Sequence, residues 1–308
     1  MINKEFWNGK TVLITGSNGF VGKNLLSYIS CLDCQFLIPT RKELDLTCQK
    51  QTSDFFSSNN IDIVIHLAGL VGGIEANNSR LGDFFYQNAM IGINVFHYSY
   101  LNGVQKFVGL AAGCGYPDVA IPFKESDFWN GFPDHNSYGY SMAKKNLIIQ
   151  SWAYRDQYNF DSTILIPANL YGPYDNFDLE TSHVVPALVR KFIEADDEVV
   201  VWGSGKASRE FIYVEDVCKS IVECCEIKDL RGPYNLGTGV ETTIKELIEA
   251  ISIATDFEGK VVWDSSRPDG QHRRYYDMSE FKNDIGHVPS TPLLEGIHKT
   301  VDWYRNEH

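Results

Sequence analysis

A glycine-rich turn near the start of the chain is the feature that most limits its fold. The turn, Gly16-Ser-Asn-Gly19-Phe-Val-Gly22, follows the β-branched run Thr11–Thr15 and opens a helix-compatible stretch from Val21 to Ile29. In this strand–turn–helix context, glycines permit a tight turn and let the backbone approach a pyrophosphate, whose charge rests on N–H groups at the helix N-terminus. The turn therefore predicts a dinucleotide-binding site. The alternative is a purely structural turn, because a glycine triplet by itself is weak evidence.

Short β-branched runs alternate with helix-length segments over the first half of the chain. This alternation is typical of βαβ units. It predicts an α/β fold with a Rossmann-type parallel sheet and helices on both faces. The expected strands are Thr11–Thr15, Gln35–Pro39, Asp62–Leu67, Lys106–Ala111 and Ser162–Pro167.

Beyond about residue 170 the alternation breaks, and Gly/Pro-rich segments separate shorter elements. We therefore expect a dinucleotide-binding domain followed by a smaller mixed α/β lobe that binds substrate. The expected dinucleotide-binding domain is 1–170, with about 211–236 returning to it, and the expected substrate lobe is 171–210 and 237–308.

Composition and charge narrow the choice of partners. The 308 residues are 44% hydrophobic, as in a folded chain, and 40 acidic against 27 basic residues give a formal net charge of −13. Nucleic acid is not expected as a partner, since binding its backbone needs clustered Lys and Arg.

No apolar run approaches the roughly 18 to 20 residues that cross a bilayer, and the first residues lack the apolar core of a signal peptide. We expect a cytoplasmic protein without a membrane partner.

The seven cysteines are irregularly spaced. Cys31 and Cys34 form a CxxC pair, but no second pair or nearby histidine completes a zinc-binding set. We expect these two to be ordinary buried or partly buried thiols, and we expect no metal site.

The segment after the second expected strand bears on the choice of dinucleotide. An NAD-preferring site would place an acidic side chain there, on the ribose 2′-hydroxyl, whereas this chain has Arg41. A guanidinium can pair with a 2′-phosphate in fork geometry. Arg41 therefore favours NADP(H). The alternative is that Arg41 and Lys42 form a solvated pair in a loop.

Tyr140 and Lys144 lie four residues apart in a helix-compatible segment that begins near Asn136. At this spacing the phenol and the ammonium share one helix face. The ammonium favours the phenolate, so a tyrosine that normally titrates near pH ~10 is expected to move toward the working range of a proton donor or acceptor. A YxxxK match alone is common by chance, but together with the upstream turn it predicts the catalytic pair of a reductase.

These motifs and several longer segments resemble the extended short-chain dehydrogenases/reductases and, within them, the GDP-L-fucose synthase family. The glycine turn and YxxxK are shared by the whole superfamily, whereas the VGGI, LYGPxDNF, SHVxPAL and WGxG…REF patterns point to this family in particular. The matching segments run in order over nearly the whole chain: Thr40–Leu46, His66–Ile74, Cys114–Pro117, Tyr140–Lys144, Asn169–Phe177, Ser182–Leu188, Val201–Gly205 and Arg209–Asp216.

The resemblance implies an enzyme of nucleotide-sugar biosynthesis that reduces the C4 ketone of a GDP-4-keto-6-deoxy sugar with NADPH. Tyr140 would protonate the C4 oxygen, and Lys144 would hold the ribose and lower the phenol pKa. The family uses a cysteine and a histidine to epimerise C3 and C5, and the matching positions are Cys114 and His183. Two alternatives stay open. One is a C4 reductase alone, acting on a GDP-4-keto heptose or similar sugar that another enzyme has epimerised, and the other is a non-catalytic NADP-binding protein.

The resemblance also implies which residues contact each ligand. Those expected at the cofactor are Gly16, Ser17, Asn18, Gly19, Phe20, Val21, Arg41, Leu67, Ala68, Gly69, Lys144, Pro167, Asn169, Leu170 and His183. Those expected at the GDP-sugar are Val71, Gly72, Gly73, Cys114, Asn169, Arg190, Lys191, Trp202, Arg209 and Arg274. The arginines among them suit a diphosphate because a guanidinium binds phosphate oxygens in pairs.

One departure from the family pattern concerns the loop that carries the cysteine. Where the family has Ser-Ser-Cys, this chain has Ala112-Gly113-Cys114, so the hydroxyl that hydrogen-bonds the C4 oxygen is missing. Loss of such a donor can cost about 100- to 1,000-fold in rate unless a water or another side chain replaces it. The next residue, Gly115, is small where the family has a bulky one. We therefore expect extra room near the reacting ring and a substrate other than the usual hexose, such as a heptose.

Two long helices are expected at about 80–102 and 136–157. In the family the corresponding helices form a four-helix bundle between two subunits, so the resemblance implies a homodimer. Aromatic residues on the first helix, Phe84, Phe85 and Tyr86, are expected to serve core or dimer packing rather than ligand binding.

Overall fold

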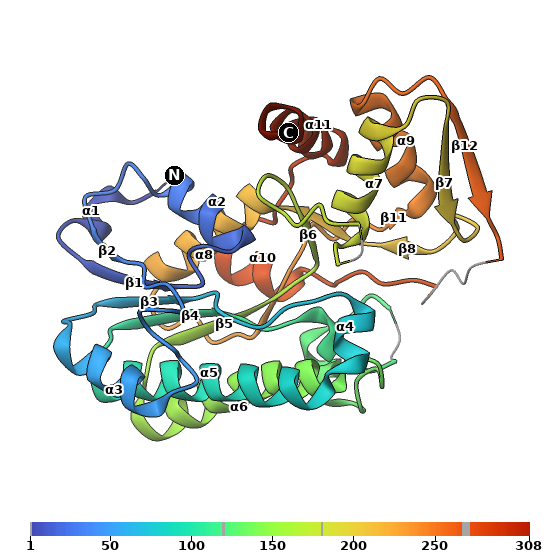
Figure 1. Ribbon diagram of the computed structural model, residues 1–308. Helices are drawn as coiled ribbons and strands as arrows, with labels where there is room; N and C mark the ends of the chain where they lie inside the picture. Colours follow the sequence, from blue (N-terminus) through green and yellow to red (C-terminus); the bar gives the residue numbers. More distant parts are fainter. Residues whose placement is uncertain (1, 119–120, 180, 267–271) are drawn as a thin grey trace.

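The computed structural model describes residues 2–118, 121–179, 181–266 and 272–308 (Figure 1). A six-stranded sheet lies at its centre in the order β10-β5-β4-β3-β1-β2, and each neighbouring pair is parallel. All five predicted strands are present, and the predicted Rossmann-type α/β fold is confirmed. The strands of the sheet are β1 (Thr11–Thr15), β2 (Gln35–Leu37), β3 (Ile63–His66), β4 (Lys106–Leu110), β5 (Ser162–Pro167) and β10 (Tyr234–Leu236).

Helices cover both faces of the sheet (Figure 1). One layer contains α3 (Gln49–Ser58), α5 (Leu81–Leu101) and α6 (Tyr138–Tyr158), and the other contains α2 (Phe20–Tyr28), α8 (Val214–Glu226) and α10 (Ser279–Ile285). Because both faces are covered, every residue of β3, β4 and β5 is buried. This burial explains why these strands lack the alternation of polar and apolar residues that a sheet with one solvated face would show.

The helices α5 and α6 pack along each other on one side of the sheet (Figure 1). Gly139, near the start of α6, allows their close approach, because a Cβ there would lie 2.3 Å from the carbonyl oxygen of Leu81. Both helices match the two long helices expected from the sequence to within two residues at each end.

The carboxyl ends of the parallel strands meet at one edge of the sheet. Since β1 lies between β2 and β3, the chain leaves β1 toward one side for β2 and crosses to the other side for β3. In doubly wound sheets such a switch point is where nucleotides bind, outside the carboxyl ends of the strands. The loops after β1, β3, β4 and β5 start here and contain most of the residues expected at the cofactor.

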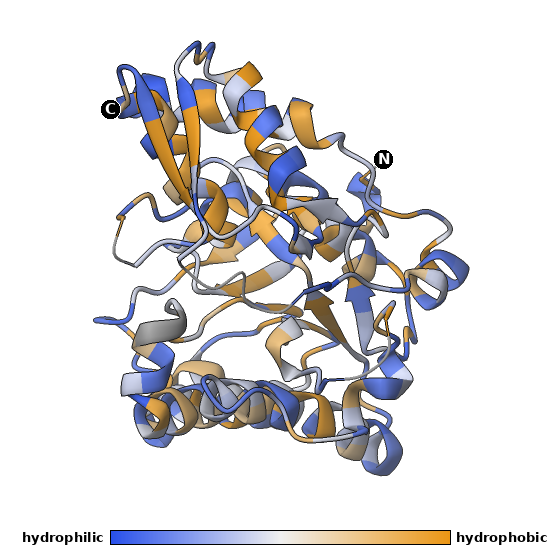
Figure 2. Cartoon of the chain, turned by 90° about the vertical axis from the view of Figure 1, so that its right-hand side faces the viewer, coloured by the Kyte–Doolittle hydropathy of each residue, from blue (hydrophilic) through white to orange (hydrophobic). Residues whose placement is uncertain are grey.

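A smaller lobe lies to one side of the sheet, at the upper right of Figure 1. Along β7, exposed and buried residues alternate, and Figure 2 shows hydrophobic and hydrophilic residues along the β7–β12 pair, as expected for strands with one solvated face. The lobe contains α7 (Val184–Glu194), α9 (Ile244–Ala254) and α11 (Leu293–Glu307), the parallel pair β7 (Glu198–Trp202) and β12 (Lys260–Asp264), and the antiparallel pair β8 (Ser208–Arg209) and β11 (Thr242–Thr243).

Several short elements complete the chain, and two of them connect the lobe to the sheet. β6 (Asn169–Tyr171) follows β5 directly and pairs in parallel with β9 (Phe211–Tyr213), after which α8 packs on α2 and β10 joins the edge of the sheet at β5. The chain therefore returns to the sheet after the first part of the smaller lobe. The other short elements are α1 (Lys4–Trp7), α4 (Ile74–Ser79) and the 3₁₀ turns η1 (Gly113–Gly115) and η2 (Glu125–Trp129).

The CxxC cysteines differ in their surroundings. Cys34 is partly buried and its thiol donates to the carbonyl oxygen of Trp7 at 3.0 Å. Cys31 is exposed, so the expectation that it is at least partly buried is wrong, because it lies in the turn that follows α2. Across the described residues, no group of three or more His, Cys, Asp and Glu side chains is placed to hold a metal ion. Among the described helices, none combines the length and the apolar character needed to span a bilayer.

Candidate active site

The loops after β1 and β3 touch each other through glycine. Gly16 adopts a φ of 74°, and a Cβ at this position would lie 2.7 Å from the backbone nitrogen of Ala68. At Gly22, a Cβ would lie 2.4 Å from the Gly16 carbonyl oxygen. Because both neighbours are backbone atoms that cannot swing aside, only glycine fits at either position. The glycine spacing is thus a steric requirement of the contact between the two loops and of the turn before α2.

The same turn has the features of an anion site. α2 follows Gly19, which has no side chain to cap the helix, so N–H groups of the first turn are available to a ligand. The Ser17 hydroxyl is buried and has no hydrogen-bond partner in the part of the chain that the structure describes. A buried hydroxyl without a partner costs free energy, so a phosphate oxygen is a suitable acceptor for it. The predicted residues Asn18, Phe20 and Val21 lie in this turn and in the start of α2.

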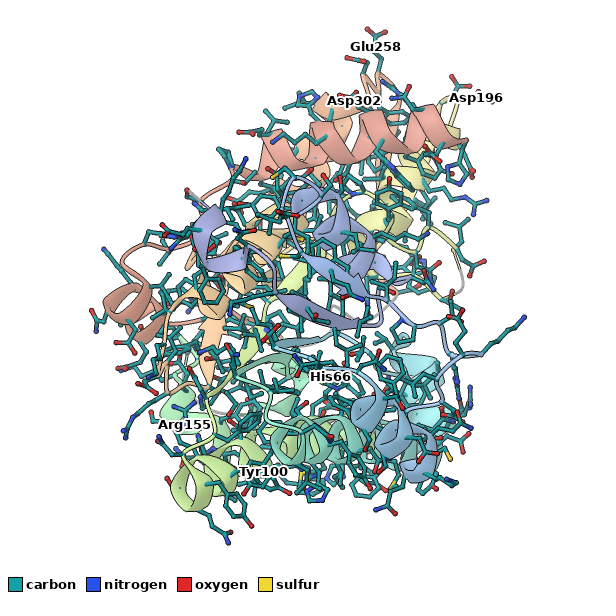
Figure 3. The ribbon with its side chains drawn as sticks, turned by 90° about the vertical axis from the view of Figure 1, so that its left-hand side faces the viewer. His66, Tyr100, Arg155, Asp196, Glu258 and Asp302 are labelled. Carbon is teal, nitrogen blue, oxygen red and sulfur yellow. The ribbon has the colours of Figure 1, made fainter. Side chains whose placement is uncertain are left out.

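A buried hydrogen bond fixes the starts of the two loops. Thr15 and His66 face each other across the β1–β3 pair, and Thr15 Oγ1 lies 2.8 Å from His66 Nδ1. The backbone N–H of Ala68 donates to the same hydroxyl oxygen at 3.3 Å. Burial lowers the pKa of His66 to about 3, so the ring is neutral at physiological pH, and Figure 3 shows it in the interior. Sequence reasoning missed this pair, although Thr15 ends the first predicted strand and His66 is the second-to-last residue of the third.

Arg41 lies in the loop after β2, at the edge of the sheet. Its side chain is exposed, and Nη2 donates to Oε1 of Gln87 on α5 at 3.3 Å. Within the described residues the guanidinium makes no other hydrogen bond. The remaining N–H groups are therefore free to pair with a phosphate.

Tyr140 and Lys144 lie on one face of α6, as their spacing predicts. Lys144 Nζ is 5.8 Å from the centroid of the Tyr140 ring and donates to the carbonyl oxygen of Leu110, the last residue of β4, at 3.2 Å. The lysine is 7% exposed. Burial lowers its pKa to about 8, and the nearby Cys114 opposes this shift. The ammonium is thus a buried cation at the carboxyl edge of the sheet.

The Tyr140 phenol titrates in the direction opposite to the one expected from the sequence. Its ring packs edge-on against Phe84, with 6.3 Å between the centroids, and burial together with Cys114 raises its pKa. The expectation that Lys144 lowers this pKa is wrong, because desolvation outweighs an ammonium that makes no hydrogen bond to the phenol in the described structure. Tyr140 is therefore protonated at neutral pH, which is the state that a proton donor requires.

Asn88 on α5 holds the loop after β3 against the helix layer through hydrogen bonds. Its side-chain oxygen accepts from the Leu70 N–H at 2.9 Å, and its amide donates to the carbonyl oxygens of Phe84 and Leu70 at 2.7 and 3.1 Å. At Gly69, a Cβ would lie 2.9 Å from that Asn88 oxygen and 3.3 Å from Lys144 Nζ. Gly69 thus places no side chain against the ammonium. An asparagine within a helix gives no local signal of this role, so sequence reasoning missed it.

The loop after β4 places Cys114 beside α6. Ser141, which is fully buried, lies with its Oγ 3.1 Å from Cys114 Sγ and 3.0 Å from the Cys114 carbonyl oxygen. The single proton of this hydroxyl is shared between these two acceptors. Ser141 therefore orients Cys114 and places a hydrogen-bond donor beside its sulfur. Ser141 directly follows the predicted tyrosine, yet no sequence pattern pairs it with Cys114.

Gly115 does not leave the expected extra room. A Cβ at this position would lie 2.3 Å from Cζ of Phe128, whose ring is fully buried. The space that a bulky residue would take is therefore filled by η2, and the expectation of an enlarged pocket at this glycine is wrong. Ala112, at the start of the same loop, is also buried and is 8% exposed.

His183 is the residue that precedes the first turn of α7. Its side chain is exposed, yet desolvation by the surrounding protein lowers its pKa. No hydrogen bond joins it to Cys114 in the described structure. Two buried oxygens in the preceding segment, Oδ2 of Asp175 and Oγ of Ser182, have no hydrogen-bond partner among the described residues. Polar groups of a ligand would satisfy them.

Arg209 and Arg274 come together from distant parts of the sequence. Burial, followed by the charge of Arg274, lowers the pKa of the Arg209 guanidinium. Two like charges held close together in partly buried positions are stabilised by an anion between them. Both residues were expected to face a diphosphate, and their proximity suits that ligand.

Three further residues expected at the sugar-nucleotide, Trp202, Lys191 and Arg190, differ in their contacts. Trp202 is 61% exposed, and Nζ of the partly buried Lys191 lies 5.6 Å from the centroid of its ring. Arg190 is instead engaged: Nε pairs with Glu194 at 2.8 Å and Nη1 donates to the Phe177 carbonyl oxygen at 3.2 Å. These contacts fix Arg190 along α7.

The remaining predicted residues line the ends of β3 and β5. Leu67 and Ala68 follow β3, and Pro167, Asn169 and Leu170 end β5 and form β6. Asn169 donates from Nδ2 to the Glu210 carbonyl oxygen at 2.9 Å. The set that precedes α4 comprises the exposed Val71 and the partly buried Gly72 and Gly73.

Comparison with known proteins identifies the family. Residues 12–237 match the NAD dependent epimerase/dehydratase family. The protein named putative GDP-L-fucose synthase 2 from Arabidopsis thaliana is 39% identical over 299 residues, covering 95% of this chain and 91% of that protein. A GDP-L-fucose synthetase from Naegleria fowleri bound to NADP has a TM-score of 0.90 at 28% identity, covering 97% of this chain and 93% of that one. The GDP-mannoheptose C4 reductase MlghC from Campylobacter jejuni with NADP bound has a TM-score of 0.88 at 29% identity, covering 97% and 98%. The chain belongs to the NAD dependent epimerase/dehydratase family.

Proposed function

We propose that this protein is an NADPH-dependent oxidoreductase that reduces the C4 ketone of a GDP-4-keto sugar in nucleotide-sugar biosynthesis. The observation that carries the proposal is a protonated Tyr140 one helical turn from the buried Lys144, at the carboxyl edge of the sheet. A proton donor and a cation beside a dinucleotide turn are what ketone reduction requires. The relatives with GDP-L-fucose synthase and GDP-mannoheptose C4 reductase activities in their names support the same reaction class.

The cofactor site is supported by the residues that would hold NADP(H). The N–H groups at the start of α2 and the Ser17 hydroxyl would bind the pyrophosphate, and Arg41 the 2′-phosphate. Lys144 would donate to the ribose hydroxyls, since Gly69 places no side chain against its Nζ. When bound, NADPH supplies the hydride.

Tyr140 carries the proton chemistry. As the C4 carbon gains hydride, its oxygen gains negative charge, and the neutral phenol donates its proton to that oxygen. Ala112 supplies no hydroxyl to this oxygen, so the phenol is the donor on which reduction depends.

The sugar-nucleotide would bind across the smaller lobe. Arg209 and Arg274 would hold the diphosphate, and Trp202 with Lys191 would contact the sugar. The guanine base is proposed from the relatives alone, because the described contacts carry no signal for one base.

Epimerisation at C3 and C5 is a second activity of the same site, with Cys114 and His183 as the acid and base. The Ser141 hydroxyl favours this activity, because it places a hydrogen-bond donor 3.1 Å from the Cys114 sulfur that would exchange a proton with the sugar. The alternative is a C4 reductase alone, which the C. jejuni enzyme represents among the solved structures. The third alternative, a non-catalytic NADP-binding protein, follows only from the missing hydroxyl at Ala112.

We further propose a cytoplasmic homodimer that pairs α5 and α6 with their copies in a four-helix bundle. Exposed apolar side chains along both helices support this face: Phe85, Tyr86, Ile93, Leu101, Tyr138, Met142, Ile149 and Tyr158. A row of such residues on two adjacent helices is typical of a protein interface.

The function is tested by incubating the protein with NADPH and GDP-4-keto-6-deoxymannose in deuterated water. NADPH oxidation with deuterium at C3 and C5 supports the coupled epimerase, and oxidation without exchange at carbon supports the reductase alone. No oxidation across a panel of GDP-4-keto sugars contradicts the proposed reduction.

Tyr140→Phe should lower kcat by about 100-fold or more while NADPH affinity stays nearly unchanged, because only the proton is lost. Unchanged turnover in this variant would contradict the role of the phenol.

Arg41→Ala should weaken NADPH binding by about tenfold, because a charge-assisted contact to phosphate is lost, and should leave NADH binding unchanged. Lys42→Ala is the matched control, since it removes a neighbouring positive charge from the same loop. Titration of both dinucleotides by fluorescence measures the effect. Equal weakening of NADPH and NADH, or an equal effect of Lys42→Ala, argues against the 2′-phosphate contact.

NADPH affinity should fall as pH rises from 7 to 9, because Lys144 has a pKa of about 8 and loses its charge over this range. With a single group of this pKa, the protonated fraction falls from about nine-tenths to about one-tenth, so the change is up to about tenfold. Calorimetry on wild type and on Lys144→Met measures it. Lys144→Met should bind NADPH weakly and with equal affinity at pH 7 and pH 9. If the affinity of this variant still falls with pH as in wild type, the titrating group is not Lys144.

Dimerisation should be lost in Ile149→Glu, because a charge is placed in the centre of the exposed face of α6. Ile253→Glu is the control, since Ile253 is also exposed and lies on α9 in the smaller lobe. Sedimentation velocity should show two chains per particle for wild type and the control and one for Ile149→Glu. A monomeric wild type would refute the proposal.

A further inference from the structure

Tyr276 reaches from the smaller lobe to the loop that carries Cys114. Its ring is 4% exposed, and its hydroxyl donates to the carbonyl oxygen of Pro167, the last residue of β5, at 3.1 Å. Its backbone N–H donates to Oε2 of Glu210 at 2.7 Å. Both ends of Tyr276 are therefore fixed, and the phenol points at the carboxyl edge of the sheet.

The hydroxyl of Tyr276 occupies the volume that a side chain at residue 113 would need. A Cβ at Gly113 would lie 1.9 Å from the Tyr276 hydroxyl oxygen and 3.2 Å from the Pro167 carbonyl oxygen. The Gly113 backbone is not in the left-handed region, so its own conformation does not demand glycine. Glycine is required at this position by Tyr276.

The same segment binds the loop through its backbone. Arg274 donates to the carbonyl oxygen of Gly113. On the opposite side of the loop, Ser141 donates to Cys114. The loop is therefore held between a hydroxyl from α6 and a phenol and guanidinium from the smaller lobe.

We propose that Tyr276 is a positioning residue: its hydroxyl takes the place of a side chain at residue 113 and fixes loop 112–115 against the end of β5. Through this contact it sets where Cys114 and Ala112 lie relative to Tyr140. The consequence for turnover rests on the proposed function, whereas the consequence for the cysteine does not. Arg274 also lies beside Arg209, so the placement of the loop is linked to the proposed diphosphate site.

Three variants test the proposal. Tyr276→Phe leaves the Pro167 carbonyl without its partner, and Gly113→Ser forces a Cβ into the Tyr276 hydroxyl, so each should lower kcat about tenfold or more. The double variant moves the hydroxyl from residue 276 to residue 113, within reach of the same carbonyl, and should recover most of the wild-type kcat. NADPH affinity should stay within about twofold in all three, because the cofactor turn is untouched.

A measurement without substrate separates this proposal from the proposed function. The rate of Cys114 alkylation by iodoacetamide, followed by peptide mass spectrometry against the partly buried Cys48, should rise in both single variants and return in the double variant. Tyr234→Phe is the matched control, since it removes a buried phenol whose partner is Asp284, away from the loop.

The outcomes are distinct. If the single variants lower only the midpoint of thermal unfolding, with Cys114 reactivity and kcat as in wild type, Tyr276 is a packing residue and the proposal is overturned. If kcat and Cys114 reactivity in the double variant are changed by the combined effects of the two single variants, a hydroxyl at residue 113 does not replace that of Tyr276, and the proposal is refuted. A wild type that reduces no GDP-4-keto sugar contradicts the proposed function, and the alkylation rates then still decide the role of Tyr276.

Discussion

The buried ammonium of Lys144 is the constraint around which the candidate site is organised. Burying a cation costs free energy unless hydrogen bonds replace its lost water. The Leu110 carbonyl accepts one of its N–H groups at 3.2 Å, which ties α6 to the end of β4. Gly69 and Asn88 bring the loop after β3 to the same nitrogen. A ligand with ribose hydroxyls completes the set of partners, so the site is built to gain stability when a cofactor binds.

Two departures from the family pattern, Gly113 and Gly115, are compensated by packing from within the protein. Where the family has serine, Gly113 has no side chain, and the Tyr276 hydroxyl occupies the position. The small Gly115 is covered by the Phe128 ring. These two replacements therefore change which residues pack on the loop without opening space beside it. Under the proposed function, the identity of the sugar would be set elsewhere, and we propose the exposed Trp202 with its neighbour Lys191 for this role.

The sequence predicted the parts of the structure that depend on local pattern. The alternation of strands and helices is local, and so are the glycine turn and the one-turn spacing of Tyr140 and Lys144. The phenol pKa was predicted in the wrong direction, because desolvation by Phe84 and its surroundings is a property of tertiary packing. The contacts of Tyr276 with Gly113, and of Phe128 with Gly115, join residues far apart in the chain, and no periodicity reports them. The sequence therefore shows where a residue is small, but it does not show whether the space beside that residue is empty or is filled by a distant side chain.

The central claim is that a sugar C4 carbon receives hydride beside the Tyr140 phenol. The most direct measurement uses NADPH that carries deuterium at the transferable position of its nicotinamide, with the product examined by NMR. The account predicts one deuterium bound to C4 of the GDP-sugar for each NADPH oxidised. Oxidation of NADPH with protium at C4, or deuterium that appears on another carbon of the sugar, would contradict it.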